Sequence, residues 1–204
     1  MHGSRKKWLY LITGFSYGKE KIQEALRAGV DVIQLREKNI SSAEYLCRAK
    51  ILVEMAQNTG TKVIINDRVD IALLSGADGV HLGQDDVPAQ DARRLMGSGK
   101  VIGVTAKTQE QAKAAEAAGA DYLGSGAWFP TSTKQDAVPI TQERYREILE
   151  AVSIPDVAVG GITVENCGVP LACGCDGLAV SSGIMKATDI SGTVRRFRRI
   201  LDTW

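Results

Sequence analysis

The sequence predicts an α/β fold, a single-domain (β/α)8 TIM barrel, from three observations. A Gly-x-Asp turn comes before four short apolar segments, which are residues 32–35, 79–82, 122–125 and 177–180. Four other apolar runs alternate with them, at residues 8–12, 63–65, 101–104 and 157–159. Each run is followed by a segment of helical character, and eight such units in 204 residues fit a compact barrel. The whole chain, 1–204, is therefore expected to form one barrel domain.

The predicted helices follow these runs in order, at residues 19–28, 42–59, 69–74, 87–95, 109–118, 141–152, 163–172 and 190–204. Ser41 or Ser42 is expected to cap the second helix and Thr141 the sixth, because hydroxyl side chains satisfy free N–H groups there. Pro170 is expected to shorten or kink the seventh. The rival fold, a doubly wound open sheet, is disfavoured because no Gly-x-Gly-x-x-Gly follows the first strand.

Composition excludes several classes of protein. The net charge of +1 gives no general reason to expect nucleic acid as a partner, and no apolar run is long enough to span a membrane. No secretory signal core is present, so a cytoplasmic protein with reduced cysteines is expected. The polar residues 1–7 are expected to be disordered or derived from cloning. The oligomeric state stays open, and a homo-oligomer is compatible with the sequence.

Acidic and amide side chains follow the third and fourth predicted strands. Asn66 and Asp67 end one strand, and Gln84, Asp85 and Asp86 follow the other. The carboxyl ends of neighbouring parallel strands open on the same side, so these side chains are expected to meet. Crowded carboxylates repel one another unless a cation or proton intervenes, and oxygen ligands suit Mg²⁺. Capping of the next helices is an equally good interpretation from spacing alone.

Other strand ends carry groups suited to phosphate. Arg36 and Lys38 would share one face of an extended chain, and two cations suit a diphosphate. The longest loop holds hydroxyls and one ammonium group in succession, at residues 131–134. Gly160-Gly161 and Ser181-Ser182 follow the last two strands, where this fold often binds a phosphate. The alternative for each is an ordinary solvated loop.

Two further features favour structural roles. His81 lies within an apolar strand and is expected to be a hydrogen-bonded core residue rather than a catalytic one. The arginines of residues 195–199 are expected to form the solvated face of an amphipathic helix, so DNA binding is disfavoured. No Ser-His-Asp or Cys-His set suggests covalent catalysis, and electrostatic positioning of phosphates is the chemistry that the sequence favours.

Five motifs together resemble the thiamine phosphate synthase family. They are Gln34-Leu35-Arg36-Glu37-Lys38, Ile65-Asn66-Asp67-Arg68, residues 79–86, Pro130-Thr131-Ser132-Thr133-Lys134 and Val159-Gly160-Gly161-Ile162, in the family's order. The resemblance implies a (β/α)8 transferase of thiamine biosynthesis. It would join hydroxymethylpyrimidine diphosphate to thiazole phosphate and release pyrophosphate with Mg²⁺ as cofactor. These two small molecules are the expected partners, with no nucleic acid and no membrane.

The resemblance also implies roles for individual residues. The implied Mg²⁺ ligands are Asp67 and Asp86. The implied catalytic residues, most of which would grip the diphosphate, are Arg36, Lys38, Asn66, Thr105 and Lys134. Gln34 should touch the pyrimidine, with Thr105 near the pyrimidine and the leaving group. The implied thiazole phosphate site is Thr131, Thr133, Gly161, Ser181 and Ser182.

The chain departs from the family pattern at two positions. Gly14 stands where the family often has Asp, and Thr105 where it usually has Ser. Lys107 stands near the position where the sister thiazole tautomerases carry a catalytic His, which argues against tautomerase activity. An isomerase of that kind and a non-catalytic regulator that binds thiamine precursors are the alternative functions. The segment that holds Cys167, Cys173 and Cys175 matches no role in the family.

Overall fold

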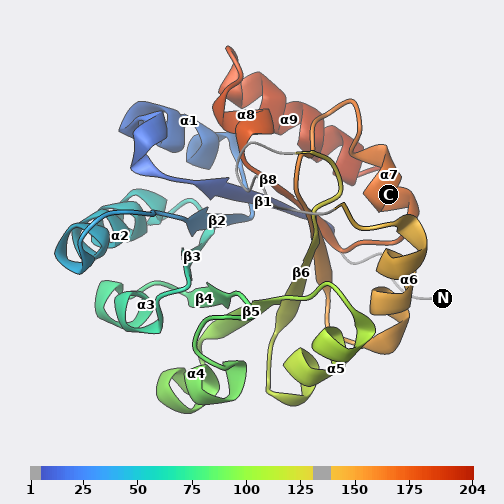
Figure 1. The fold of residues 1–204 in the computed structure, drawn as a ribbon. Helices are drawn as coiled ribbons and strands as arrows, with labels where there is room; N and C mark the ends of the chain where they lie inside the picture. The colour runs from blue at the N-terminus through green and yellow to red at the C-terminus, as the bar shows by residue number, and fades with distance from the viewer. Residues whose placement is uncertain (1–5, 131–138) are drawn as a thin grey trace.

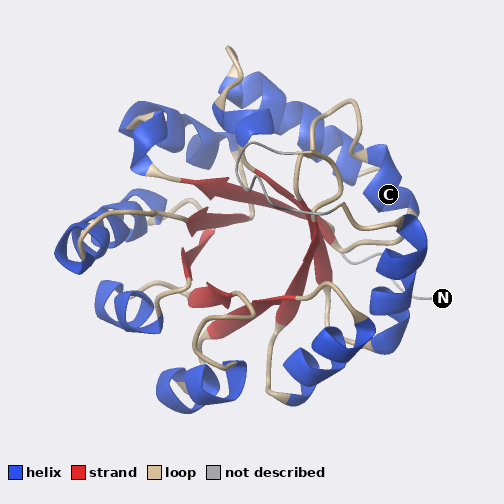
Figure 2. Ribbon diagram, viewed as in Figure 1, coloured by secondary structure: helices blue, strands red, loops and turns tan. Residues whose placement is uncertain are grey.

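The computed structural model describes residues 6–130 and 139–204, which form a closed barrel of eight parallel strands (Figures 1 and 2). The strands are β1 (Trp8–Thr13), β2 (Val32–Leu35), β3 (Lys62–Asn66), β4 (Gly79–Leu82), β5 (Val101–Thr105), β6 (Tyr122–Gly126), β7 (Asp156–Val159) and β8 (Gly177–Val180). They are hydrogen-bonded in chain order, and β8 pairs with β1 to close the ring. The predicted fold class is confirmed, and every predicted strand is present.

The helices form an outer ring around the strands, as Figure 2 shows. They are η1 (Phe15–Tyr17), α1 (Lys19–Ala28), α2 (Ser42–Ala56), α3 (Val69–Ser75), α4 (Ala89–Met96), α5 (Gln109–Ala117), α6 (Gln142–Ala151), α7 (Gly168–Ala172), α8 (Ser182–Met185) and α9 (Ile190–Leu201). Ser41 caps α2 through the Glu44 N–H, and Thr141 caps α6 through the Arg144 N–H, as predicted.

The predicted helix over 163–172 is wrong in its first half. Asn166 accepts a hydrogen bond from the Thr163 N–H and donates one to the Gly161 oxygen, so residues 163–166 form a turn. Helix α7 then starts at Gly168 and has Pro170 in its first turn, where the missing N–H costs no helical hydrogen bond. Helices η1 and α8 were not predicted, because they are too short to show a helical period.

Two hydrophobic cores hold the barrel together. Alternate residues of each strand face opposite sides, so Leu9 and Leu11 pack outward against the helices while Tyr10 faces the barrel interior. The outer core, between strands and helices, is mainly aliphatic. The interior core includes two tyrosines, Tyr10 and Tyr122, whose hydroxyl groups need partners. This polar interior lies directly beneath the cavity described below.

The Gly-x-Asp repeat proves to be a structural joint made four times at the amino-terminal ends of the strands. Each aspartate carboxylate accepts a hydrogen bond from a backbone N–H of the strand before it. The pairs are Asp31 with Leu9, Asp78 with Val63, Asp121 with Ile102 and Asp176 with Asp156, at 2.7–3.0 Å. Each aspartate N–H in turn donates to the carbonyl of the same partner residue. The repeat therefore fastens odd-numbered strands to even-numbered ones.

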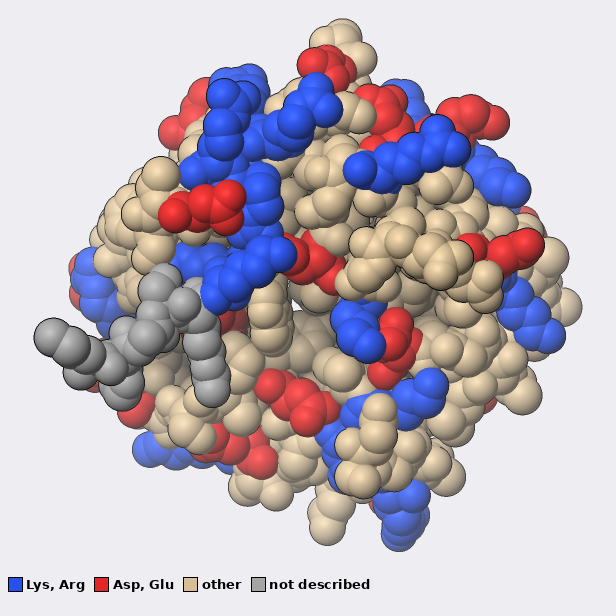
Figure 3. All heavy atoms as spheres, turned by 180° about the vertical axis from the view of Figure 1, so that it is seen from behind, with Lys and Arg blue, Asp and Glu red and all other residues tan. Residues whose placement is uncertain are grey.

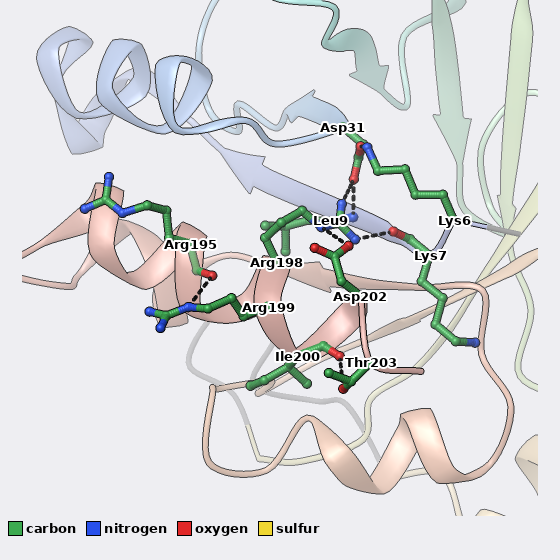
Figure 4. A network of polar contacts seen from close by, with 10 residues as sticks. All are labelled: Lys6, Lys7, Leu9, Asp31, Arg195, Arg198, Arg199, Ile200, Asp202 and Thr203. Carbon is green, nitrogen blue, oxygen red and sulfur yellow. Dashed lines mark hydrogen bonds and ion pairs between the residues drawn. The ribbon is translucent and has the colours of Figure 1, made fainter. Parts of the chain in front are cut away.

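Asp31 joins the largest of these groups of contacts, which Figure 4 shows. Its carboxylate pairs with Lys6 and with Arg198 of α9, each at 2.5 Å, and Arg198 also donates to the Lys7 oxygen at 2.6 Å. The expectation that all the arginines of this helix face solvent is wrong for Arg198, whose side chain is only 19 % exposed. Arg195, Arg196 and Arg199 are exposed as predicted.

The face seen from behind in Figure 3 carries Lys and Arg side chains next to Asp and Glu side chains. Lys6 and Lys7, from the segment predicted to be disordered or derived from cloning, contact Asp31 and the Cys175 oxygen respectively. Residues 1–5 lie outside the described residues. Within the part of the chain that the structure describes, no helix is long and apolar enough to cross a membrane.

Candidate active site

A cavity of about 550 Å³ opens at the carboxyl-terminal ends of the strands. It lies where barrels of this architecture carry their chemistry, and its size suits a small organic ligand. The site residues predicted from the sequence that line it are Gln34, Arg36, Lys38, Asn66, Asp67, Asp86, Thr105, Gly161, Ser181 and Ser182. The structure thus brings together ten residues that lie far apart in the sequence.

Asp67 and Asp86 form the acidic part of the wall. Asp67 adopts a left-handed backbone conformation, with φ of 64°, directly after β3, and its N–H donates to the His81 oxygen. Asp86 accepts a hydrogen bond from the Gly83 N–H at 2.6 Å. Burial, and then the neighbouring Asp67 carboxylate, raise the pKa of Asp86. Neither residue caps a helix, because the N-caps of α3 and α4 are Arg68 and Pro88.

The two carboxylates fit a magnesium ion in the kind and number of donors. Mg²⁺ usually takes one or two protein carboxylates and completes its shell with water and phosphate oxygens. Among the described residues there is no group of three or more His, Cys, Asp or Glu that could hold a metal ion alone. A cation held here would therefore need oxygen atoms from a ligand or from water.

Basic side chains come from the segment after β2. Arg36 and Lys38 both line the cavity, while Glu37 between them points away. Glu37 accepts hydrogen bonds from the Phe15 N–H at 2.8 Å and from Arg48 of α2 at 2.9 Å. The predicted alternation is therefore observed. Lys38 Nζ lies 2.5 Å from Asp67 Oδ2, so its ammonium group balances that carboxylate.

Tyr45 of α2 holds the ends of two strands in register. Its buried hydroxyl lies 2.8 Å from the Leu35 oxygen and 3.1 Å from the Asn66 oxygen, which end β2 and β3. Burial is the main cause that raises the pKa of this phenol, so the group stays a neutral donor. Tyr45 thereby helps to position Arg36, Asn66 and Asp67 from outside the barrel.

A chain of hydrogen bonds crosses the floor of the cavity. Gln34 Nε2 lies 2.8 Å from the Tyr10 hydroxyl, which lies 2.8 Å from the Tyr122 hydroxyl. His81 Nδ1 lies 3.0 Å from Tyr122, and His81 Nε2 lies 3.0 Å from Thr105 Oγ1. Burial lowers the pKa of His81 to about 4, so the imidazole is neutral at pH 7. The predicted hydrogen bonding of His81 is confirmed, but the residue is half-buried and lines the cavity rather than lying in the core.

The opposite wall comes from β7 and β8. Gly161 has φ of 65°, and a Cβ there would lie 2.7 Å from backbone oxygens of Phe129 and Pro130. Only glycine therefore lets the loop after β6 approach the loop after β7 so closely. Ser181 follows β8 and Ser182 begins α8, and both side chains line the cavity.

Some predicted site residues cannot be placed, and some lining residues were missed. Thr131, Thr133 and Lys134 lie outside the described residues. Gln84 and Asp85, which were expected beside Asp86, line the cavity, and so do Tyr10, Ile12, His81 and Lys107. Tyr10 could have been noticed as a polar group that interrupts an aliphatic strand. The sequence does not reveal which face of that strand points inward, so the signal alone is weak.

The fold and this cavity define a single-domain barrel enzyme with acidic, basic and hydroxyl groups at its mouth. The family model described as thiamine monophosphate synthase matches residues 9–184. A thiamine-phosphate synthase of Methanobrevibacter smithii is 46% identical over 88% of this chain and 88% of its own. One of Clostridioides difficile is 44% identical over 93% of this chain and 92% of its own. The chain belongs to the thiamine monophosphate synthase family, whose members are transferases.

Solved structures agree with this assignment. The thiamine phosphate pyrophosphorylase of Pyrococcus furiosus has a TM-score of 0.89 and 38% identity, and the match covers 97% of this chain and 96% of that one. A 3-hexulose-6-phosphate synthase has a TM-score of 0.71 at 16% identity, which shows a shared fold alone. The resemblance stated from five sequence motifs is therefore confirmed over nearly the whole chain.

Proposed function

We propose that this protein transfers the hydroxymethylpyrimidine group from its diphosphate to thiazole phosphate, with release of pyrophosphate. The bond between the pyrimidine methylene carbon and the diphosphate oxygen breaks, and its electron pair leaves with pyrophosphate. The thiazole nitrogen supplies the electron pair of the new carbon–nitrogen bond. No proton moves, so the reaction needs no general base, and both ring nitrogens of His81 are hydrogen-bonded, to Tyr122 and Thr105.

One observation carries the proposal. The groups suited to a metal diphosphate, on β2, β3 and β4, and the groups suited to a monophosphate, after β7 and β8, line one cavity. A barrel closed in this order puts these strands on different sides of its mouth. Two phosphorylated substrates can then approach each other with their rings between the two anion-binding regions, which makes the transfer effectively unimolecular.

The diphosphate half of the site is assigned to residues with fixed positive charge or amide donors. Arg36 would bind the diphosphate through two N–H groups, and Lys38 would act as a point charge. Asn66 would donate through its amide group, and Lys134 is assigned to the same diphosphate. Gln34 is assigned to the pyrimidine ring, with Thr105 between the ring and the leaving group.

Asp67 and Asp86 are the residues that would hold Mg²⁺. When bound, the ion would offset the negative charge that develops on the departing diphosphate. Lys38 now neutralises Asp67, and it can release this carboxylate to a divalent cation without leaving a buried charge unpaired, because its own side chain is 53% exposed. Thr131, Thr133, Gly161, Ser181 and Ser182 are assigned to the phosphate of the thiazole.

The experiment is a pyrophosphate-release assay with both substrates, either one alone, and EDTA. Release is expected only with both substrates and Mg²⁺. Asp67→Asn is expected to lower kcat at least about 100-fold and to weaken the apparent Mg²⁺ affinity, because it removes a charged ligand beside the reacting diphosphate. Asp70→Asn is the matched control, because Asp70 is an exposed residue of α3 that pairs with Arg68. Release without thiazole phosphate or without Mg²⁺ would contradict the proposal.

The two alternative functions, a tautomerase-like isomerase and a non-catalytic regulator, are not favoured, since the relatives described above are named as synthases. We place the protein in the cytoplasm. All four cysteines are free, and Cys167, Cys173 and Cys175 are buried, which is typical of a reducing compartment.

A further inference from the structure

With Gln34 Nε2 placed toward Tyr10, the hydrogen-bonded chain on the cavity floor runs in one direction. Gln34 Nε2 can only donate, so the Tyr10 oxygen accepts from it and the Tyr10 hydrogen is left for the Tyr122 oxygen. The Tyr122 hydrogen then has one remaining partner, Nδ1 of His81, which must accept. A histidine that accepts at Nδ1 carries its hydrogen on Nε2, and this hydrogen points to Thr105 Oγ1.

Because the two tyrosines are buried, a single hydrogen bond of this chain cannot easily reverse its donor and acceptor while the others stay as they are. Tyr10 and Tyr122 are 1% and 2% exposed, so a hydroxyl hydrogen left without an acceptor there is strongly unfavourable. The chain therefore reverses only as a whole, with the Gln34 amide turned over and His81 in its other tautomer. Each member fixes the orientation of the next.

The direction decides what the two ends offer to a ligand. Gln34 keeps Nε2 on Tyr10, so its carbonyl oxygen Oε1, which accepts no hydrogen bond from another described residue, is left as an acceptor at the cavity wall. Thr105 accepts from His81, so its own hydrogen can be donated into the cavity. A reversed chain would offer the opposite pair, a donor at Gln34 and an acceptor at Thr105.

We propose that Tyr10, Tyr122 and His81 are positioning residues that lock Gln34 as an acceptor and thereby select an aminopyrimidine diphosphate over its oxo analogue. This rests on the proposed function, since it deepens the recognition of the same substrate. An exocyclic amine donates to Gln34 Oε1, whereas a ring carbonyl would face that oxygen with no hydrogen between them. A site built to pair with a donor rejects the analogue that lacks one.

The direction can be measured without any variant or substrate. The sequence has two histidines, His2 and His81, so nitrogen NMR of ¹⁵N-histidine protein gives two ring patterns that separate readily. His81 is expected in the Nε2–H tautomer, with an unprotonated, hydrogen-bonded Nδ1. The Nδ1–H tautomer, or a mixture of the two, would overturn the proposal. This readout is independent of whether the protein has the proposed activity.

Specificity is tested with Tyr122→Phe and Tyr10→Phe, which remove one hydroxyl each and keep the ring. The ratio of kcat/KM values for the amino and oxo pyrimidine diphosphates is expected to fall at least about tenfold in each variant, because the Gln34 amide becomes free to turn over. The KM for thiazole phosphate is expected to stay the same. Tyr145→Phe is the matched control, because Tyr145 is a buried tyrosine bonded to Asp156 outside the cavity.

The outcomes separate the two proposals. A wild-type protein that releases no pyrophosphate with both substrates contradicts the proposed function, while the tautomer measurement still stands. An active wild type whose variants lose the same factor of activity on both pyrimidines shows a merely structural role and overturns the inference. If one tyrosine variant does not fold, the other and the tautomer measurement still decide.

Discussion

Asp156 shows how one buried carboxyl group can set the pH dependence of stability. It has no exposed surface and begins β7, where its oxygens lie 2.5 Å from Ser125 Oγ and 2.7 Å from the Tyr145 hydroxyl. It thereby fastens α6 to the neighbouring strands. Burial is the main cause that raises the pKa of Asp156 to about 7.

We expect Asp156→Asn to flatten the pH profile of stability. With the pKa raised from 3.8 to about 7, the folded state holds a proton that the unfolded state has lost. The stability that this proton provides is complete below about pH 4 and is lost as the pH rises through about 7. The free energy of unfolding of the wild type should therefore fall relative to the variant between pH 5 and pH 8.

Urea denaturation at several pH values measures this difference. Asp91→Asn on α4 is the control, and its profile should match the wild type because the Asp91 side chain is 46% exposed and pairs with the exposed Arg94. A constant gap between wild type and Asp156→Asn across this range would show that Asp156 stays charged in the folded protein.

At the scale of elements, Tyr45 links α2 to the ends of β2 and β3. Tyr45→Phe is expected to cost about 1–3 kcal/mol, since it removes a buried donor from two strand-end carbonyl groups. It should also raise the KM for the pyrimidine diphosphate, because Arg36 and Asn66 lose their common support. Thermal denaturation and steady-state kinetics measure the two effects.

Tyr145→Phe supplies the comparison for this prediction. It also removes a buried hydroxyl donor, but from Asp156, so it should lower stability without raising that KM. If both variants raise the KM equally, the effect of Tyr45 is general destabilisation rather than support of the site.

Strands and helices could be predicted where the sequence pattern that marks them lies within the element itself. The eight strands were found because each is a short apolar run bounded by turn residues. The start of α7 was not found, because side-chain hydrogen bonds of Asn166 form a turn that competes with the helix. The site was predicted from strand ends, and most of those residues do line one cavity. Tyr10 and Tyr122 were not predicted as part of the site, because the pairing of their hydroxyl groups depends on closure of the barrel.

The whole molecule separates stability from chemistry at its two ends. The four aspartate joints lie where the strands begin, and the cavity lies where they end. Asp31→Ala is expected to lower the free energy of unfolding by about 2 kcal/mol, because the Leu9 N–H and the half-buried Arg198 lose an acceptor. The kcat of the folded fraction should not change.

Chemical denaturation and active-site kinetics on the same preparation measure both quantities. Asp91→Ala is the matched control, because it removes a half-exposed carboxylate of α4 that pairs with Arg94. A drop in kcat for Asp31→Ala at full folding would mean that the two ends of the barrel are coupled.

Because the same Gly-x-Asp joint recurs around the barrel, the fold does not depend on which two strands lie next to the chain termini. Asp176 accepts the Asp156 N–H as Asp78 accepts that of Val63, and the Trp8 N–H bonds to the Asp176 oxygen across the gap between the last strand and the first. Arg198 and Lys7 already touch there. A linker between the two termini and new ends at another Gly-x-Asp turn would leave each strand with the same two neighbours. A circularly permuted chain of this kind should therefore fold into the same barrel.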